Sequence, residues 1–289
     1  MTSPLDAAYS SVMSGVPVRQ AAREHGVSRA TLRYRLQTRQ MPKSTAQHTA
    51  LCLYDIHYPH EDKEHIGLAI EDAKTRYNID TVVLGGDIVD CESISRFGRG
   101  HDTMPLREEI DYATIELGKL RGAFPKSRIC YIKGNHEARL QRYLWDKATE
   151  IATLKGLTLQ EQLELSQNNI HWYDNDQLKR EHGTYFRLGR LNILHGHELG
   201  ICPRVNPAHR YLQRAKSSLM VGHIHRSDTA TDRTIDNKVI GCECVGTLAD
   251  LRPEYRPQND WIAGFAVVQI DADGYFRVDN RKIIDGRVV

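Results

Sequence analysis

The chain has 289 residues, and its 39 Lys and Arg residues against 37 Asp and Glu residues leave a formal net charge of +2. This small balance excludes a whole-chain field that would draw the protein to nucleic acid or to an acidic membrane surface, and the length allows one large domain of about 240 residues beside a small module. The six cysteines show no C-x-x-C spacing, so the sequence indicates neither a zinc ribbon nor a disulfide framework.

The sequence shows no basic-then-apolar leader, and no apolar run approaches the ~18 residues of a membrane span. We therefore expect a cytoplasmic protein that has reduced thiols and no membrane partner.

Charge is unevenly distributed along the chain. Residues 1–45 hold seven Lys or Arg residues against two Asp or Glu residues, a local balance of +5. This asymmetry predicts an N-terminal module that binds anions.

Residues 5–39 are predicted to form three short helices. Pro17 opens the second helix, because a proline at the first helical position loses no hydrogen bond. A glycine turn follows, and Ser28 is a candidate N-cap of the third helix. On that helix Leu32 and Leu36, four residues apart, point into a narrow shared core. The side chains left largely outward are Arg29, Thr31, Arg33, Tyr34 and Arg35.

This pattern over residues 1–42 resembles a helix-turn-helix of the pipsqueak or resolvase type, in which the second helix of the motif enters the major groove of DNA. The resemblance implies that the outward residues contact DNA, and arginines rather than mixed charges occupy this face. Two alternatives remain, a basic helical cap without a DNA role and a module that contacts protein. Residues 40–47 show no hydrophobic period and are predicted to form the linker.

Residues 48–289 form the second predicted domain, and its first half alternates strands with helices. This alternation favours parallel βαβ units, which bind ligands at the carboxyl ends of their strands. The strands are expected at residues 49–54, 81–84 and 128–132, and the helices at residues 61–77, 105–121 and 137–154.

Strands dominate the prediction for the second half, which suits two sheets packed face to face. Helices are expected only at residues 158–165 and 206–215, and residues 271–274 are expected to form a hairpin turn. The strands are expected at residues 184–188, 191–194, 218–221, 229–235, 238–245, 262–270 and 275–278.

Polar motifs follow five of these strands, where the chain leaves the core. A single His-x-His is common in proteins, but five such motifs at strand ends are hard to explain as separate surface or core features. Imidazole with carboxylate or amide oxygen is the donor set of a catalytic divalent metal, and not of a thiolate site. The motifs are D-x-H at Asp55, G-D-x-x-D at Gly86, G-N-H-E at Gly134, H-G-H at His195 and G-H-x-H at Gly222.

The ordered set of motifs resembles the calcineurin-like metallophosphoesterase superfamily. The resemblance implies an α/β fold, the four-layer α/β/β/α metallophosphoesterase sandwich, with two divalent metal ions. Mn²⁺ is expected, and Fe, Zn, Ni and Mg are alternatives. Within H-G-H the first histidine is assigned as the ligand, since it comes first after its strand. The implied ligands are Asp55, His57 and His225 for the first metal, Asn135, His195 and His223 for the second, and Asp87 for both.

The resemblance also matches Asp90 and His136 to an acid–histidine pair, in which the carboxylate keeps the imidazole protonated so that it can donate to the leaving oxygen. For Asp90 alone, a helix N-cap is the alternative. Cys91 stands where the protein-phosphatase branch has arginine, which weakens a phosphoprotein-phosphatase assignment. The candidates for a phosphate contact are Arg96, Arg99, Arg139 and His197.

The two regions together favour a two-metal phosphoesterase, in particular a phosphodiesterase or nuclease whose DNA is recruited by the N-terminal module. The alternatives are a phosphomonoesterase for a small molecule or a protein, and a DNA-binding regulator whose second domain senses a phosphorylated ligand. No metal ligand of the motif set is missing, which favours the enzyme over the regulator. The sequence does not separate diester from monoester substrates, and it indicates no oligomeric state.

Overall fold

The computed structural model describes residues 4–29, 32, 33, 36, 47–96, 103–201, 203–254 and 256–289. The chain forms two compact units, Met1–Thr45 and Ala46–Val289. Within the described residues, no helix is both long enough and apolar enough to cross a membrane.

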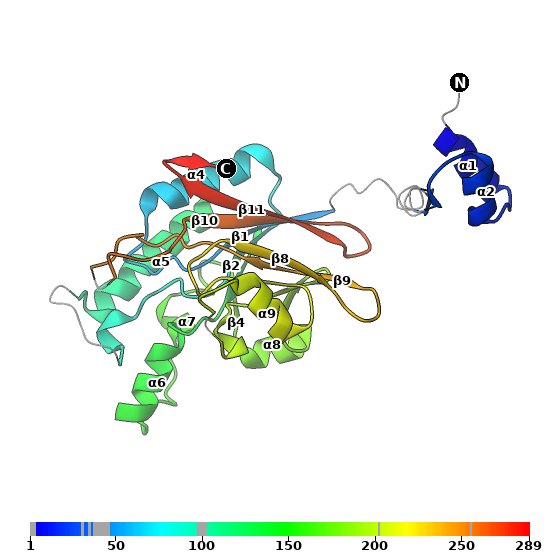
Figure 1. Cartoon of the computed structure of the whole chain (residues 1–289). Helices are drawn as coiled ribbons and strands as arrows, with labels where there is room; N and C mark the ends of the chain where they lie inside the picture. Colours follow the sequence, from blue (N-terminus) through cyan, green and yellow to red (C-terminus); the bar gives the residue numbers. More distant parts are fainter. Residues whose placement is uncertain are drawn as a thin grey trace. The chain divides into compact units, whose positions relative to one another are not determined.

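The N-terminal unit is built around a small apolar core. Its helices are α1 (Pro4–Met13) and α2 (Val18–Glu24), shown in blue in Figure 1. Leu32 is fully buried and Leu36 packs against the same cluster, so both leucines point inward as their spacing predicts. The cluster consists of the buried Ala8, Ala21, Ala22 and Leu32, with Tyr9, Val12, Val16, Val18, Val27 and Leu36 partly buried against it.

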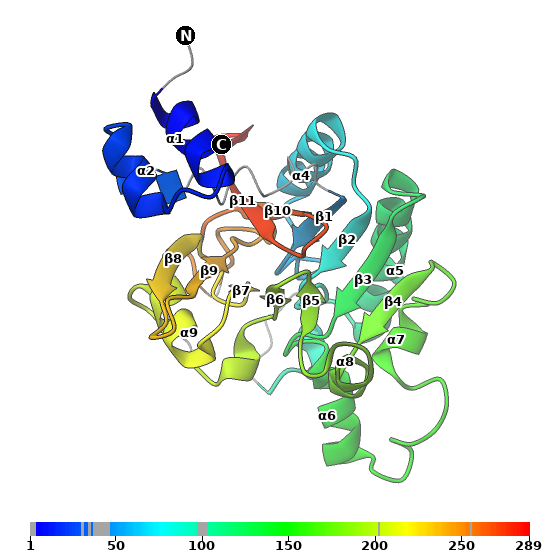
Figure 2. The same cartoon turned by 90° about the vertical axis from the view of Figure 1, so that its right-hand side faces the viewer.

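The larger sheet of the second unit has the order β12-β11-β10-β1-β2-β3-β4, and Figure 2 shows it from β11 to β4. Strands β1 to β4 run parallel to one another. Strand β10 pairs antiparallel with β1, β11 antiparallel with β10, and β12 antiparallel with β11. All of β2 is buried, as expected of a parallel strand that is covered on both faces. The strands are β1 (His48–Leu53), β2 (Thr81–Leu84), β3 (Arg128–Ile132), β4 (Ile170–Tyr173), β10 (Gly264–Ile270), β11 (Phe276–Ile284) and β12 (Arg287–Val288).

The smaller sheet has the order β5-β6-β7-β9-β8 and is also mixed. Its central strands β6, β7 and β9 run parallel, and β5 and β8 are antiparallel to their neighbours. The strands are β5 (Phe186–Leu188), β6 (Leu191–Ile193), β7 (Leu219–Val221), β8 (Asp228–Arg233) and β9 (Val239–Cys244).

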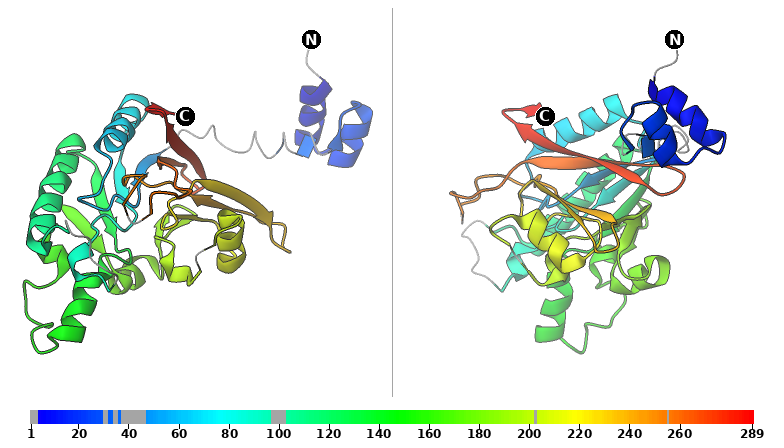
Figure 3. Two further views of the ribbon diagram at one scale, coloured as in Figure 1. Left: turned by 60° about the vertical axis from the view of Figure 1, so that its left-hand side comes forward. Right: turned by 45° about the vertical axis from the view of Figure 1, so that its right-hand side comes forward.

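The two sheets pack face to face (Figure 3). Ala50, Cys52 and Val83 of the larger sheet share one buried cluster with Ile193 and Met220 of the smaller sheet. The alternate residues of β1 and β2 point the other way, because successive strand residues face opposite sides of a sheet.

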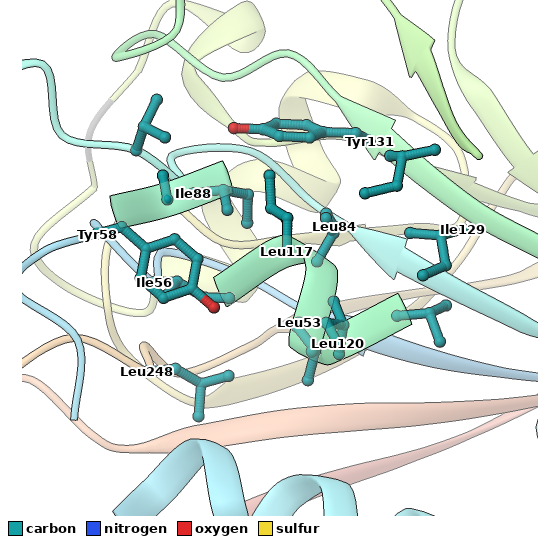
Figure 4. Close-up of a cluster of buried hydrophobic side chains, with 14 of the residues drawn as sticks. Leu53, Ile56, Tyr58, Leu84, Ile88, Leu117, Leu120, Ile129, Tyr131 and Leu248 are labelled. Atoms are coloured by element: carbon teal, nitrogen blue, oxygen red, sulfur yellow. The ribbon is translucent and has the colours of Figure 1, made fainter. Parts of the chain in front are cut away.

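Helices cover the outer faces of both sheets. On the larger sheet, Leu117 of α5 (Leu106–Ala123) packs against Leu53 and Leu84, as Figure 4 shows, and α4 (Lys63–Arg76) joins the same cluster. The helix α9 (Pro207–Ala215) packs on the smaller sheet through its own buried cluster. The predicted four-layer α/β/β/α arrangement is therefore confirmed.

Most predicted bounds shift by one or two residues, and three predicted elements differ more from the structure. The helix expected at residues 137–154 is α6 (Ala138–Lys147); just beyond its end the Thr149 hydroxyl donates to the carbonyl of Trp145, a local bond that competes with helix continuation. The helix expected at residues 158–165 is the single turn α7 (Leu159–Gln162). The last predicted strand, β11, continues to Ile284 because it pairs along β10 and then with β12.

The sequence prediction missed several short elements, of which β4 and α8 are the longest. The strand β4 extends the larger sheet beside β3, and α8 (Asn175–His182) follows it. The start of α8 carries a local signal, since the Asp174 carboxylate accepts hydrogen bonds from the backbone N–H groups of Asp176 and Gln177.

Candidate metal centre

The five polar motifs lie where parallel strands of the two sheets end. Parallel strands place their carboxyl ends at the same edge of a sheet, so residues distant in sequence meet there. β1 leads to Asp55 and His57, β2 to Asp87 and Asp90, β3 to Asn135 and His136, β6 to His195, and β7 to His223 and His225.

Backbone strain gathers at these strand ends. Asp55, His57, Asp87, His223 and His225 all have φ between 50° and 67°, in the left-handed region. This conformation costs a non-glycine residue on the order of 1–3 kcal/mol, and it persists where surrounding structure enforces it. The concentration of strained polar residues in one place therefore indicates a functional site.

Asp55, His57 and His225 form the first donor cluster, and all three are buried. Nε2 of His225 lies 3.2 Å from Nε2 of His57 and 3.3 Å from Oδ1 of Asp55. That Asp55 oxygen has no hydrogen-bond partner in the described part of the chain. A buried carboxylate oxygen without a donor is costly unless a cation meets it, and the nitrogen and oxygen donors around it fit a divalent metal ion.

The second donor cluster centres on His195, which is fully buried. Its Nε2 lies 3.1 Å from Oδ2 of Asp87, 3.1 Å from Oδ1 of Asn135 and 3.1 Å from Nδ1 of His223. The cluster again contains imidazole, carboxylate and amide donors and no thiolate, so it fits the same class of metal.

Asp87 connects the two clusters. Besides its place beside His195 and His223, its carboxylate lies within 4.8 Å of ring nitrogens of His57 and His136. Its Oδ1 accepts a hydrogen bond of 2.9 Å from the backbone N–H of His136. One buried carboxylate between two donor clusters is what a bridged pair of cations needs.

The charges of the buried groups at the centre favour the binding of cations. Burial raises the pKa of Asp87, but the neighbouring His195, His136 and His57 together outweigh burial and hold the pKa well below its usual range. Burial lowers the pKa of His195, but the Asp87 carboxylate raises it by more, so the pKa of His195 is about 10. Burial and then the charge of His195 lower the pKa of His223 to about 4, which favours the neutral imidazole that binds metals.

Hydrogen bonds fix the ring nitrogens that face the clusters. Nδ1 of His57 lies 2.8 Å from Oδ1 of Asp90, and Nδ1 of His195 lies 3.2 Å from the carbonyl oxygen of Gly85. When each Nδ1–H donates to its oxygen acceptor, Nε2 is left with a lone pair directed into the cluster.

Glu137, the last residue of G-N-H-E, was given no role by the sequence. It is buried, and its carboxylate accepts hydrogen bonds from the backbone N–H groups of Asp87, Ile88 and Gly134 and from the hydroxyl of Tyr131. These bonds hold the loop after β2 against the loop after β3. The only sequence signal was its place in the motif.

The Asp90 carboxylate contacts two imidazoles and does not cap a helix. Its Oδ1 lies 2.8 Å from Nδ1 of His57 and 2.8 Å from Nδ1 of His136. The short helix that follows, Glu92–Ile94, has Cys91 at its N-cap position without a side-chain cap, so the N-cap alternative for Asp90 does not hold.

Arg139 lies against the same pair. Its guanidinium donates to the carbonyl of Asp90 at 2.7 Å, and Nη2 lies 2.9 Å from Nε2 of His136. Burial lowers the pKa of His136, but the carboxylates of Asp87 and Asp90 raise it by more, so the pKa lies above its usual value. The group therefore places an imidazole that takes up a proton, a carboxylate and a guanidinium beside both donor clusters.

Two other candidates for a phosphate contact, His197 and Arg96, are described and do not belong to the two clusters. The His197 ring centroid is 5.3 Å from that of His195, and burial lowers its pKa. Arg96 is exposed just after the short helix Glu92–Ile94, and Arg99 lies outside the described residues.

Trp261 also lies at the centre, and no sequence motif predicted its presence there. Its ring centroid is 4.3 Å from that of His225, at an interplanar angle of 61°. The backbone N–H of Ile262 donates to the His225 carbonyl at 2.8 Å, which ties the two segments together.

The N-terminal unit presents part of the predicted DNA-binding face. Arg29 and Arg33 are exposed, on the chain segment whose Leu32 is buried. Thr31, Tyr34 and Arg35 lie outside the described residues.

Two donor clusters joined by one aspartate, at the strand ends of an α/β/β/α fold, define a metallophosphoesterase. Residues 52–227, more than half of the chain, match the calcineurin-like phosphoesterase family, and the chain belongs to this family. It is a phosphoesterase, and its buried His and Asp clusters are consistent with a dinuclear metal site. Residues 4–44 match the helix-turn-helix, Psq domain, which confirms the resemblance to the pipsqueak type.

Among solved structures, the chain matches a single mutant of Vps29 from Entamoeba histolytica at 13% sequence identity and a TM-score of 0.41. The match covers 83% of this chain and 96% of the Vps29 chain. The comparison with curated proteins gives no match.

Proposed function

We propose that the chain is a two-metal phosphodiesterase that cleaves DNA and that its N-terminal module, residues 1–42, binds duplex DNA. The observation that carries the proposal is the pair of donor clusters joined by Asp87, with the Asp90–His136 pair beside it. The regulator alternative has no such support, because a purely sensing domain does not need a complete ligand set with a proton donor.

Seven residues of the two clusters would hold the metals. When bound, the two cations supply a deprotonated water near neutral pH and neutralise charge on the phosphoryl oxygens. Mn²⁺ is the proposed ion, since the donors are imidazole, carboxylate and amide. The first set is Asp55, His57 and His225, the second is Asn135, His195 and His223, and Asp87 belongs to both.

The chain's own acid is His136. Asp90 accepts from Nδ1 of His136 and so orients the ring, which leaves Nε2 to hold the proton that goes to the leaving oxygen. Arg139 donates to Nε2 while the ring is neutral. After protonation of the ring, the guanidinium is free to turn toward a phosphoryl oxygen, which it binds through paired N–H groups.

The proposal that the substrate is DNA rests on the Psq module. Its exposed Arg29 and Arg33 are suited to backbone phosphates, whose neutralisation releases counterions and makes binding salt-dependent. The sequence predicts a linker of about eight residues, 40–47, and so short a tether would raise the effective concentration of a bound duplex for the second domain.

The test uses the full chain loaded with Mn²⁺ and three substrates: duplex DNA, bis(4-nitrophenyl) phosphate and 4-nitrophenyl phosphate. We expect both diesters to be hydrolysed faster than the monoester. In the double variant Arg29→Gln/Arg33→Gln, DNA cleavage should fall while hydrolysis of the small diester stays unchanged. Arg107→Gln, an exposed arginine of α5, is the matched control.

Fast turnover of the monoester without DNA cleavage would replace the nuclease by the phosphomonoesterase alternative. Equal DNA cleavage by the double variant and the control would keep the nuclease and remove the recruiting role of the module.

A further inference from the structure

A pocket borders both donor clusters. Its volume is about 490 Å³, and His223 and His225 form part of its wall. This volume lies within the ~300–1,000 Å³ typical of pockets that hold one compact organic ligand. The rest of the wall comes from Ile224 and Arg226 and from two loops, residues 203–204 and residues 256–261. Trp261 contributes the aromatic surface.

Trp261 is held in a fixed position. Its backbone N–H donates to Oδ1 of Asn259 at 2.9 Å, and the Asn259 side chain in turn donates to the carbonyls of Leu251 and Arg256. The guanidinium carbon of Arg256 lies 6.0 Å from the Trp261 ring centroid. An anchored indole beside an arginine is the arrangement on which a nucleobase stacks, with the cation available for the adjoining phosphate.

The charges around the pocket favour an anion. Arg226 donates to Asp260 at 2.7 Å and to the carbonyl of Pro203 at 2.6 Å, so it ties the two loops together and neutralises the one acidic group among the described lining residues. Arg204 and Arg256 are exposed, and neither forms an ion pair with another described residue. These two arginines therefore leave an unbalanced positive charge at the rim.

A second pocket adjoins the first, and none of the candidate metal ligands lines it. It has a volume of about 670 Å³ and shares Pro203 and Arg204 with the first pocket. Arg210 and Arg214 of α9 line it, and no described acidic residue does. A phosphodiester chain that leaves the metal centre along this path meets arginines in succession, as single-strand binding grooves require.

We propose that the two adjoining pockets bind a single-stranded DNA segment, with one base stacked on Trp261 and the following phosphates held by Arg256, Arg204 and Arg210. The proposal rests on the phosphodiesterase function and makes it more specific. A base inside a duplex has both faces covered by its neighbours, so stacking on Trp261 requires an unpaired strand. The N-terminal module and this path would then contact different forms of DNA.

The first experiment measures binding without turnover. In the full chain with Mn²⁺ and the His136→Ala change, a fluorescent oligothymidylate of about ten nucleotides is titrated by anisotropy at low salt. Trp261→Leu should raise the Kd for this single strand by roughly tenfold, and the matched control Trp145→Leu, an exposed tryptophan of α6, should not. Equal Kd values for both tryptophan variants would overturn the proposal.

A second variant does not depend on the packing of Trp261. Arg204→Gln/Arg256→Gln changes two exposed side chains, and we expect it to weaken single-strand binding and to reduce its salt dependence, whereas Arg107→Gln should change neither. A loss that is equally large for a duplex of matching length would contradict the preference for an unpaired strand.

Hydrolysis of bis(4-nitrophenyl) phosphate separates this proposal from the proposed function. A wild-type chain that hydrolyses no diester would refute the phosphodiesterase, and the binding titrations would still decide the pocket. Diester hydrolysis with unaltered single-strand binding by Trp261→Leu would refute the pocket alone.

Discussion

The two donor clusters differ in what holds their imidazoles. In the first cluster, His57 is oriented by the Asp90 carboxylate, which also binds His136. In the second cluster, His195 is oriented by the backbone carbonyl of Gly85. The first cluster is therefore coupled to the proposed proton donor through a side chain, whereas the second is coupled to the fold through the main chain. A substitution can accordingly disturb the first cluster and the acid together without touching the second.

The largest effect is expected from the residue that both clusters share. Asp87→Asn removes the carboxylate charge between them, and we expect turnover of the small diester to fall by at least about 10⁴-fold, since the charge that holds two cations together is lost. Metal analysis after Mn²⁺ loading should give fewer than two ions per chain. Full activity with two bound ions would remove Asp87 from its bridging role.

His136→Ala is the next largest change, and it separates the acid from the metals. A positioned general acid contributes ~10²–10⁴-fold, so turnover should fall by that factor while both metals remain bound. Circular dichroism and metal analysis serve as controls for fold and loading. Loss of a metal ion in this variant would make His136 a ligand and would contradict its assignment as the acid.

Asp90→Asn tests the coupling between the first cluster and the acid. The amide orients His57 less well, and loss of such an outer partner typically costs ~10–100-fold in metal affinity. We expect one Mn²⁺ to bind more weakly in calorimetry while the other keeps its affinity. Equal weakening of both ions would show that the two clusters are not held independently.

The smallest effect is expected at Glu109, which holds the loop after β2 through the backbone of Cys91. Burial raises the pKa of Glu109 to about 7, and its carboxylate accepts from the backbone N–H of Cys91. Because the folded-state pKa lies above the unfolded value, the native state loses the stability linked to this proton as pH rises through about 7. The Tm of Glu109→Gln minus the Tm of the wild type should therefore be larger at pH 8 than at pH 5. A difference in Tm that is independent of pH would contradict this.

The sequence identified most of the centre because its donors stand in short motifs at strand ends. Strand runs such as Thr81–Leu84 are apolar and β-branched, so the polar residues after them were visible, and topology then brought them together. The choice of His195 over His197 as a ligand stays a prediction; the geometry places His195 inside the second cluster and His197 beside it.

Other residues of the centre could not be predicted, for a physical reason. Glu109 and Trp261 act on loops far away in sequence, through contacts that only the folded chain creates. Nothing in their local periodicity separates them from an ordinary helix glutamate or a loop aromatic. The edge strand β4 was missed for a similar reason, since it is four residues long and is defined by its pairing with β3.

Anomalous diffraction at the manganese edge, from crystals of the Mn²⁺-loaded full chain, tests the central claim most directly. The account predicts two peaks, one among Asp55, His57 and His225 and one among Asn135, His195 and His223, with Asp87 in contact with both. A single peak, or a second peak that lies away from His195, would contradict the two-metal centre.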